Sequence, residues 1–461
     1  MRSRKLILVL GFMLGMGETA LAGGLMLPTR GVRPTARAGA FVAGADDLGA
    51  LWFNPAGLVA PPPPNPKHKS KKSFLLDVSY VDQSSTYRRI DSGNNVQEPV
   101  SDSAYGRPIP TLAVGYRLSD KLSVAAGVLA PYAAVQSYPE DGPQRYSLID
   151  SSETALVILE AAVGYRVSKR LRIGAGVQNM ISELATTVVF SGCPQEVTCA
   201  PEDPEFDSLN KFSQLDLFAP SGVVGAQYDL SKGATAGVSF QFPFSISGTG
   251  DFQSRLPDSG FYDGATLVGD RGDLSLTLPP ILRAGLELHP SQRLRVELAG
   301  SIEFWSVHDK ITIDPRDVRI ENAPGLGTYE FSTINIDRDF QNSYAIALGG
   351  ELALSRKLTL LGGYSFESSA VRKRTLSVLT IDGNKHLLSG GIDVGVGGWR
   401  VNATVAYVSV ADRSVSPEDG RARQLTPLRD PQDVQAVHAL VNWGDYSASW
   451  FVAGLGIRTG F

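Results

Sequence analysis

Segments with a two-residue period dominate this chain, and this pattern most limits the folds that it can adopt. Within residues 293–304, apolar residues such as Leu294, Val296 and Leu298 alternate with charged or small ones. Similar alternation occurs at residues 171–178, 235–242 and 401–407. A two-residue period puts the apolar side chains on one face of a β-strand. The body of the chain is therefore predicted to be all-β.

Short turns and long polar stretches join these strands in strict alternation. Six short turns of related sequence begin at Tyr116, Tyr165, Tyr228, Leu288, Leu352 and Val394. Seven long stretches rich in Asp, Pro, Gly and Ser lie at residues 84–108, 134–153, 190–212, 248–274, 310–341, 374–385 and 413–446. Thirteen connections join fourteen strands. We predict a transmembrane antiparallel β-barrel of about 14 strands, with both chain ends on the short-turn, periplasmic side.

Aromatic residues at the strand ends favour the membrane location. Tyr116, Tyr165, Tyr228 and Trp399 lie where an interfacial girdle is expected. The chain ends on Phe461 after an alternating strand, which resembles the signal read by the barrel-assembly machinery. We therefore expect that machinery as a partner during biogenesis. A secreted soluble β-sandwich is the alternative, but the alternation of short turns and long loops would then be coincidental.

The first 22 residues have the features of a secretory signal peptide. Three basic residues within the first five positions precede an apolar run that ends at Met16, and Ala20-Leu21-Ala22 forms a small-x-small cleavage pattern. We therefore expect export and a bacterial outer-membrane location. The formal net charge is -4, and no basic patch indicates a nucleic-acid partner.

Cysteine and histidine usage gives no sign of enzyme chemistry. Cys193 and Cys199 lie six residues apart, and in an oxidising compartment a local disulfide is the simplest interpretation. A zinc site would need two further ligands, and no His lies near this pair in sequence. The histidines are scattered, at His68, His289, His308, His386 and His438. We predict no metal, no cofactor and no enzymatic activity.

The stretch from Gly23 to Val59 precedes the first strand, which is expected to begin at Ser73. Its small residues allow close packing inside a barrel, while its acidic and amide side chains can bond a polar lumen wall. We predict a hatch at residues 23–59, a Pro-rich basic linker at 60–72 and the barrel at 73–461. The basic run from Lys67 can lie against anionic lipid head groups or remain solvated.

The stretch GVRPTARAGAFVAGADDLGALWFNPAGL resembles the N-terminal hatch of the FadL/TodX outer-membrane transport proteins. The hallmarks of that hatch are a Gly/Ala-rich run, an acidic pair and an Asn-Pro-Ala triplet. In this chain the acidic pair and the triplet are Asp46, Asp47, Asn54, Pro55 and Ala56. The segments that begin at Gly142 and Leu276 resemble the family's fourth and fifth strands and a later hairpin. A plain Asn-Pro turn also accounts for the triplet, and both interpretations can hold together.

The resemblance implies passive transport of hydrophobic molecules, such as long-chain fatty acids, past the lipopolysaccharide leaflet. Family members capture the molecule in an extracellular groove, pass it to an apolar pocket and move the hatch. A kink in their third strand then opens the wall sideways to the membrane lipids. Here the third strand, residues 121–135, carries Gly127 and Pro131, which weaken strand pairing. The alternative is that Pro131 merely ends the strand.

A fatty acid brings an anionic head and an apolar tail, so its site needs a cation beside apolar side chains. The candidate cations are Arg145, Arg283, Arg293 and Arg295. The candidate pocket residues, all in the predicted hatch, are Phe41, Leu51, Trp52 and Phe53. Two alternatives stay open, because lumen charges often pair with one another and because these apolar residues can serve only to wedge the hatch.

Two other functions also stay open. A general diffusion porin for small polar solutes would carry an acidic constriction loop facing a basic wall, and it needs no hatch. A structural or adhesin-like barrel would bind an outside partner with its long loops, of which residues 310–341 are rich in acids. An apolar lumen near the hatch favours a hydrophobic substrate, whereas a uniformly charged lumen favours polar solutes.

Overall fold

The computed structural model describes most of the chain outside its first 25 residues. The described residues are 26–27, 30–60, 70–132, 135–194, 197–323, 327–428 and 439–459. The predicted signal peptide, most of the predicted linker and Phe461 lie outside these ranges.

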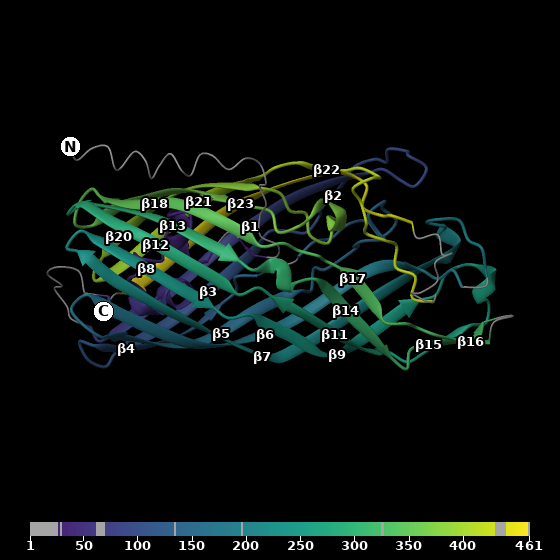
Figure 1. The fold of residues 1–461 in the computed structure, drawn as a ribbon, viewed down its shortest axis with the longest axis horizontal. Coiled ribbons are helices and arrows are strands. Elements are labelled where there is room, and N and C mark those ends of the chain that lie inside the picture. Colours follow the sequence, from purple (N-terminus) through teal and green to yellow (C-terminus); the bar gives the residue numbers. More distant parts are fainter. Residues whose placement is uncertain are drawn as a thin grey trace.

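Fourteen antiparallel strands close into the predicted barrel (Figure 1). In order around the wall they are β1 (Lys72–Arg89), β3 (Arg107–Arg117), β4 (Leu122–Leu129), β5 (Ala155–Arg166), β6 (Leu171–Ser191), β7 (Asp207–Ser231), β8 (Ala234–Gln241), β12 (Ile281–Ser291), β13 (Leu294–Glu303), β18 (Ser343–Ala353), β19 (Leu358–Glu367), β20 (Lys385–Val396), β21 (Trp399–Val410) and β23 (Gly444–Thr459). The first and last strands pair from Phe74↔Thr459 to Arg89↔Gly444, so the wall closes. The predicted fourteen-stranded barrel is confirmed.

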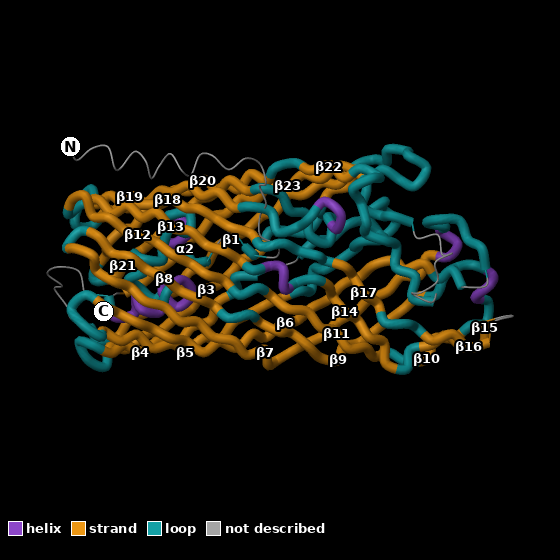
Figure 2. The backbone as a smooth tube through the Cα atoms, viewed as in Figure 1, coloured by secondary structure: helices purple, strands orange, loops and turns teal. Residues whose placement is uncertain are grey.

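The predicted turns are found, but the long stretches hold more strand than we expected. The six tight turns join β3 to β4, β5 to β6, β7 to β8, β12 to β13, β18 to β19 and β20 to β21. The long stretches contribute six further strands, which extend the barrel wall on the long-loop side (Figure 2). These strands are β2 (Val100–Ser101), β9 (Phe244–Arg255), β11 (Arg271–Leu278), β14 (Lys310–Arg316), β17 (Ile334–Asp337) and β22 (Arg413–Val415). Polar composition suggested loops, yet strands beyond a membrane need no apolar outer face.

Proline explains where two of these extensions begin. Pro243 separates β8 from β9, and Pro279-Pro280 separates β11 from β12. A proline cannot donate to the strand ladder, so each wall strand is interrupted and then continues in a new direction.

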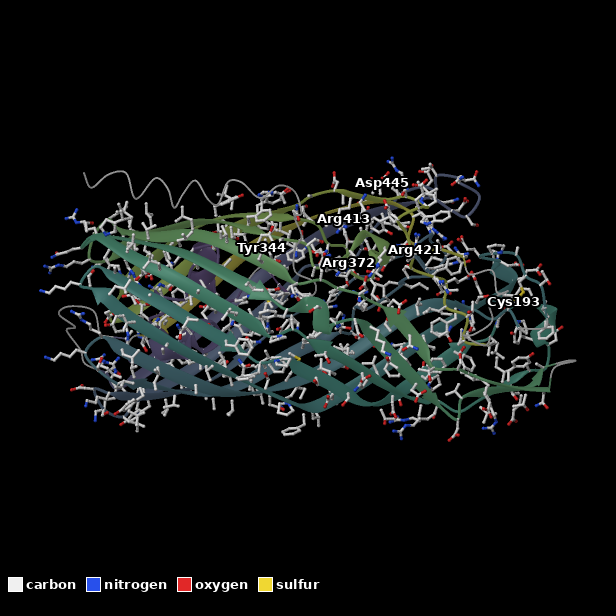
Figure 3. All side chains as sticks on the ribbon, viewed as in Figure 1. Cys193, Tyr344, Arg372, Arg413, Arg421 and Asp445 are labelled. Carbon is white, nitrogen blue, oxygen red and sulfur yellow. A yellow bond between two sulfur atoms is a disulfide. The ribbon has the colours of Figure 1, made fainter. Side chains whose placement is uncertain are left out.

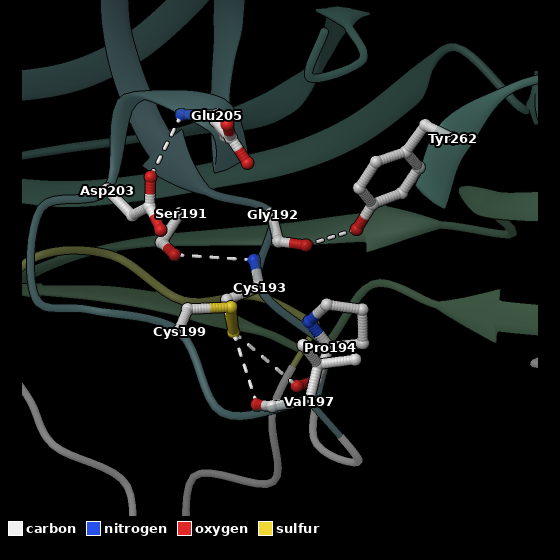
Figure 4. Close-up of a disulfide and its surroundings, with 9 residues drawn as sticks. All are labelled: Ser191, Gly192, Cys193, Pro194, Val197, Cys199, Asp203, Glu205 and Tyr262. Atoms are coloured by element: carbon white, nitrogen blue, oxygen red, sulfur yellow. Dashed lines mark hydrogen bonds between the residues drawn. A yellow bond between two sulfur atoms is a disulfide. The ribbon is translucent and has the colours of Figure 1, made fainter. Parts of the chain in front are cut away.

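A small sheet, short helices and a disulfide lie in the long loops. The sheet contains β10 (Thr266–Val268), β15 (Arg319–Ala323) and β16 (Gly327–Glu330). Short 3₁₀ helices in the loops are η2 (Pro204–Phe206), η3 (Gly260–Tyr262), η4 (Trp305–Val307) and η5 (Lys373–Thr375). A disulfide joins Cys193 to Cys199, and Tyr262 donates to the Gly192 carbonyl beside it (Figure 4).

The strands expose apolar side chains on the outside and bury polar or small ones inside. Val78, Leu348, Leu388, Val405 and Leu455 are all exposed. In a membrane barrel this outer face contacts lipid, as the two-residue period predicted. No helix among the described residues is long and apolar enough to span a bilayer.

Residues 30–60, here called the N-terminal segment, lie inside the barrel at its short-turn end (Figure 1). They form α2 (Val32–Ala36), α3 (Ala50–Phe53) and η1 (Pro55–Val59), whose residues are all buried. Helix α2 packs against β19, β20, β21 and β23, and η1 packs against β4 to β7. A Cβ atom on Gly174 would lie 2.3 Å from the carbonyl carbon of Pro55, so the wall needs glycine there.

Candidate functional site

Charged residues tie the N-terminal segment to one half of the wall. We call this set the charged belt: Arg33, Arg37, Asp46 and Asp47 of the segment, with Glu287, Arg295, Glu297, Glu351 and Arg458 of the wall. Arg37 is fully buried, and its Nη2 lies 2.8 Å from Glu287 and 3.0 Å from Glu297. Its Nη1 lies 3.1 Å from Glu351. One arginine therefore links three wall strands.

The acidic pair has partners within the segment and in the wall. Arg33 Nη1 lies 2.5 Å from Asp46 and 2.8 Å from Asp47. Across the interface, Arg295 lies 2.7 Å from Asp46, and Arg458 lies 3.2 Å from Asp47. The pair thus contacts β13 on one side and β23 on the other.

Backbone groups of the segment add to this attachment. Glu297 accepts hydrogen bonds from the N–H groups of Val42, Ala43 and Gly44, at 2.7, 2.8 and 3.0 Å. These donors would otherwise be unsatisfied in the barrel interior. A single wall carboxylate therefore fixes the segment's backbone as well as Arg37.

The Asn-Pro-Ala triplet attaches the segment to the opposite half of the wall without charges. Asn54 accepts a hydrogen bond from the Ala56 N–H at 3.2 Å, and this caps η1, with Pro55 at its first position. The Asn54 amide donates to the carbonyls of Val42 and Ala226, each at 3.1 Å. Asn54 thus connects the helix start, the Gly/Ala-rich run and β7.

The four candidate pocket residues are buried in one apolar cluster, here called the lumen cluster. The Phe41 and Phe53 rings are 5.7 Å apart, and Trp52 meets Tyr132 at 6.2 Å. The cluster continues through the barrel interior to the loop between β19 and β20, with members Phe41, Leu51, Trp52, Phe53, Tyr132, Ile158, Met180, Phe244, Ile246, Leu278, Trp305, Phe340, Leu376, Val378 and Ile381. An apolar lining therefore begins at the N-terminal segment and reaches the loop end.

Arg283 of β12 is the candidate cation that faces this cluster. Its guanidinium lies 4.8 Å from the Trp52 ring centroid, and its Nη2 donates to Gln241 at 3.3 Å. Arg283 Nη1, Gln241 Nε2 and Trp52 Nε1 are buried donors without a hydrogen-bond partner. Arg283 takes part in none of the salt bridges found in the described ranges. Three free donors beside apolar rings suit an anionic head group.

The other three candidate arginines lie elsewhere. Arg295 belongs to the charged belt, Arg293 is exposed in the turn after β12, and Arg145 pairs with Asp207 at 2.8 Å in the loops. Within the part of the chain that the structure describes, no group of three or more His, Cys, Asp or Glu side chains can hold a metal ion.

The third barrel strand, β4, is short and leaves a gap in the wall. It ends at Leu129, and its pairing with β3 ends at Leu112↔Val128. Residues 107–111 of β3 therefore pair with β1 alone, while residues 155–157 of β5 pair with β6 alone. We call the interval between these two edges the wall gap.

A cavity of about 260 Å³ occupies the wall gap. Pro108 and Pro110 of β3 line it, together with Ala130 and Leu156. Prolines cannot donate to a neighbouring strand, which accounts for the missing pairs. The local signal for this gap is the sequence RPIPT, which stands at the start of an otherwise regular strand.

The two residues proposed for a strand kink, Gly127 and Pro131, lie on either side of the end of β4 in sequence. A Cβ atom on Gly127 would lie 2.8 Å from Leu51 Cδ1, so this glycine lets the N-terminal segment touch β4. Pro131 follows the end of β4, and its carbonyl accepts a hydrogen bond from the Leu27 N–H at 2.9 Å. Gly127 thus contacts the N-terminal segment, and Pro131 contacts Leu27, which precedes that segment.

Known proteins resemble this chain in sequence and in fold. Residues 14–440 match the model of a family described as outer membrane protein transport protein (OMPP1/FadL/TodX). An outer membrane protein of Neisseria meningitidis serogroup B is 22% identical over 444 residues, which cover 89% of this chain and 91% of the relative.

Two solved structures share the fold. A FadL homologue of Pseudomonas aeruginosa has a TM-score of 0.76 at 15% identity, covering 95% of this chain and 100% of its own. The toluene transporter TodX of P. putida has a TM-score of 0.63 at 16% identity, covering 94% and 99%.

Proposed function

The chain belongs to the OMPP1/FadL/TodX family of outer membrane transport proteins, and from this premise we propose that it imports long-chain fatty acids or similar hydrophobic compounds. The segment 23–59 serves as a hatch in the barrel, and the wall gap serves as a lateral exit. The protein lies in the outer membrane, as the family assignment and the barrel indicate.

The observation that carries this proposal is the continuous lumen cluster. It extends from Trp52 in the N-terminal segment to Ile381 near the loop end, and its members are buried. Transfer of an apolar chain from water to such a surface is favourable, by about 25 cal/mol per Å² buried. A porin for polar solutes would need a hydrated path, which this lining opposes.

Arg283 supports a substrate with an acidic head. A carboxylate beside Arg283 would accept hydrogen bonds from the free donors of Arg283, Gln241 and Trp52. Its tail would then lie along the lumen cluster. A neutral aromatic hydrocarbon is a second candidate, because Trp52, Tyr132 and Phe244 offer aromatic surfaces in the same cluster.

The charged belt supports the hatch role. Its buried ion pairs close the short-turn end, so passage requires either movement of the segment or a route that avoids it. The wall gap offers such a route, since its cavity contacts both the lumen residue Leu156 and the exposed Arg107. We propose that substrate leaves through this gap into the membrane.

Uptake by a host deficient in outer-membrane fatty-acid transport tests the function. Cells expressing the chain receive radiolabelled hexadecanoic acid, and competition by hexadecan-1-ol and toluene ranks the substrate classes. We expect acid uptake with stronger competition by the alcohol than by toluene, and altered uptake when residues 23–59 are deleted. Liposome swelling by a small sugar without any acid uptake would replace this proposal with a porin.

A further inference from the structure

Exposed positive charge is concentrated at the short-turn end of the barrel. We call this set of side chains the basic ring, and it consists of the exposed Lys and Arg within residues 71–72, 118–121, 167–170, 231–233, 289–293 and 354–357. These ranges hold nine such cations and a single acid, Asp120. The chain as a whole has a formal net charge of -4, so the short-turn end differs in sign from the rest of the molecule.

The exposed cations at the loop end have acidic neighbours, and those of the basic ring do not share this arrangement. Arg255 lies 2.6 Å from Glu140, and Arg372 lies 3.5 Å from Asp339. Arg372 and Arg413, which Figure 3 labels, also share an open groove of about 1290 Å³ with several acidic side chains. Within the described ranges, no salt bridge includes a cation of the basic ring. These cations are therefore available to an anion from outside the chain.

The turns place their cations just beyond the edge of the apolar outer face. The turn after β5 shows the order, with exposed Tyr165 at the strand end, exposed Val167 next and Lys169 after it. The turns after β3 and β7 repeat this order. Tyrosines at the end of a membrane barrel lie at head-group level, and a long Lys or Arg side chain extends from there towards water. The basic ring therefore lies at the level of the lipid phosphates.

The cations of the basic ring are distributed around the barrel. They lie at the start of β1 and in the turns that follow β3, β5, β7, β12 and β18, which are spread along the closed wall. Figure 3 shows nitrogen-tipped side chains extending from this end of the molecule, at the left. Lipids surround a membrane barrel on every side, whereas a compact protein contacts one side of it. The distribution thus favours lipid head groups over a single acidic protein.

We propose that the basic ring binds the phosphate groups of phospholipids with a net negative charge in the periplasmic leaflet. A zwitterionic phospholipid is attracted less, because its own amine neutralises its phosphate. The bound lipids hold the short-turn end at a fixed depth in the membrane. This binding goes beyond the proposed function and does not depend on the transported compound, since no cation of the ring belongs to the lumen cluster or lines the cavity at the wall gap.

The lipid selectivity of the purified full chain in phosphatidylcholine vesicles tests the basic ring. Spin-labelled phosphatidylglycerol and spin-labelled phosphatidylcholine are compared by electron paramagnetic resonance, in which the motionally restricted fraction gives the relative association constant. We expect the unmodified chain to prefer the anionic lipid about three- to tenfold, because one Lys or Arg near an anionic head group accounts for about fivefold. The preference should fall in about 1 M sodium chloride, which screens exposed charges.

Two variants with the same change in net charge locate the effect. The ring variant loses four cations from two turns: Lys169→Gln, Arg170→Gln, Arg356→Gln and Lys357→Gln. The matched control loses four exposed cations at the loop end, each of which is paired with an acid: Arg255→Gln, Arg271→Gln, Arg316→Gln and Arg372→Gln. We expect the ring variant to lose more than about half of the preference and the control to retain it.

Equal preference in the unmodified chain and the ring variant would overturn the proposal. The salt series uses the unmodified chain, so it gives an answer even if the variants do not fold, and a preference that salt leaves unchanged would contradict a charged contact. Inorganic phosphate at constant ionic strength should not displace the labelled lipid, and displacement would replace the lipid site with a free phosphate site. An unmodified chain without any lipid preference would also overturn the proposal and leave an acidic soluble protein as the partner of the ring. Because the assay contains no hexadecanoic acid, failure of the transport function would not change its outcome.

Discussion

The charged belt and the lumen cluster are neighbouring regions of one barrel, yet they are held together by opposite kinds of contact. The belt joins the N-terminal segment to the wall with buried ion pairs, such as Arg37 with Glu287 and Glu297. The lumen cluster joins the same segment to the wall with rings and aliphatic side chains, such as Trp52 with Tyr132.

The two kinds of contact suit different roles for the two regions. Ion pairs need specific geometry, and loss of one buried partner is strongly destabilising, so the belt suits a closure. Apolar contacts are non-directional, so an apolar tail can replace some of them with little loss of free energy.

Arg37→Ala should have the largest effect, because it leaves Glu287, Glu297 and Glu351 buried without this partner. We expect a loss of about 3–5 kcal/mol in the free energy of unfolding. Denaturant titration of the purified barrel measures it, and liposome swelling by a small sugar should rise. Arg293→Ala, in an exposed turn, is the control. If Arg37→Ala matches that control in stability and in sugar permeation, the ion pairs do not hold the short-turn end closed.

Arg283→Met tests the role of the cation beside the lumen cluster. We expect hexadecanoic acid to bind roughly tenfold to a hundredfold more weakly, since charge-assisted hydrogen bonds of about 1.5–3 kcal/mol are lost. Binding of hexadecan-1-ol should not change. Lys211→Met removes a surface partner of Glu153 and serves as the control. Equal losses for acid and alcohol would mean that Arg283 supports the packing and not the head group.

Gly174→Ala tests the close contact between the wall and the triplet. The new Cβ would meet the carbonyl carbon of Pro55, so we expect a loss of about 1–3 kcal/mol from overpacking. Gly362→Ala is the matched control, because its Cβ would meet only Ser389 O, at 3.8 Å. Thermal unfolding followed by gel mobility compares the two variants. Similar midpoints would place the segment farther from β6 than the fold indicates.

Asn54→Ala should have the smallest effect of the four. It removes the cap of η1, which typically contributes about 0.5–2 kcal/mol. Asn54→Asp keeps the acceptor for the Ala56 N–H but loses the donors to Val42 and Ala226. Unfolding free energies of the two variants separate capping from attachment to β7. If Asn54→Asp equals the parent chain, the cap alone accounts for the residue.

The strand number and connections followed from the sequence because turns and periods are local signals. The six turns were readable from their related sequences, and the inward position of Glu297 and Glu303 was readable from the alternation around Leu298. The extensions β9 and β11 were not readable from the sequence, because polar strands outside the membrane have the composition of loops. Their interruptions at Pro243 and Pro279 were the available signal.

The site was less predictable, because its contacts join residues far apart in the chain. Three of the four candidate arginines lie on one predicted hairpin, and only the closed barrel places Arg283 beside Trp52 and Arg295 beside Asp46.

A paired flux measurement on two variants separates the role proposed for the lumen cluster, which carries the substrate, from that of the charged belt, which holds the short-turn end closed. Ile246→Gln places an amide in the lumen cluster, and Arg37→Ala opens the belt. Uptake of radiolabelled hexadecanoic acid and swelling by a small sugar are followed for each. We predict reduced acid uptake without a sugar leak for Ile246→Gln, and a sugar leak for Arg37→Ala. Unchanged acid uptake in Ile246→Gln, with no leak in Arg37→Ala, would contradict both roles.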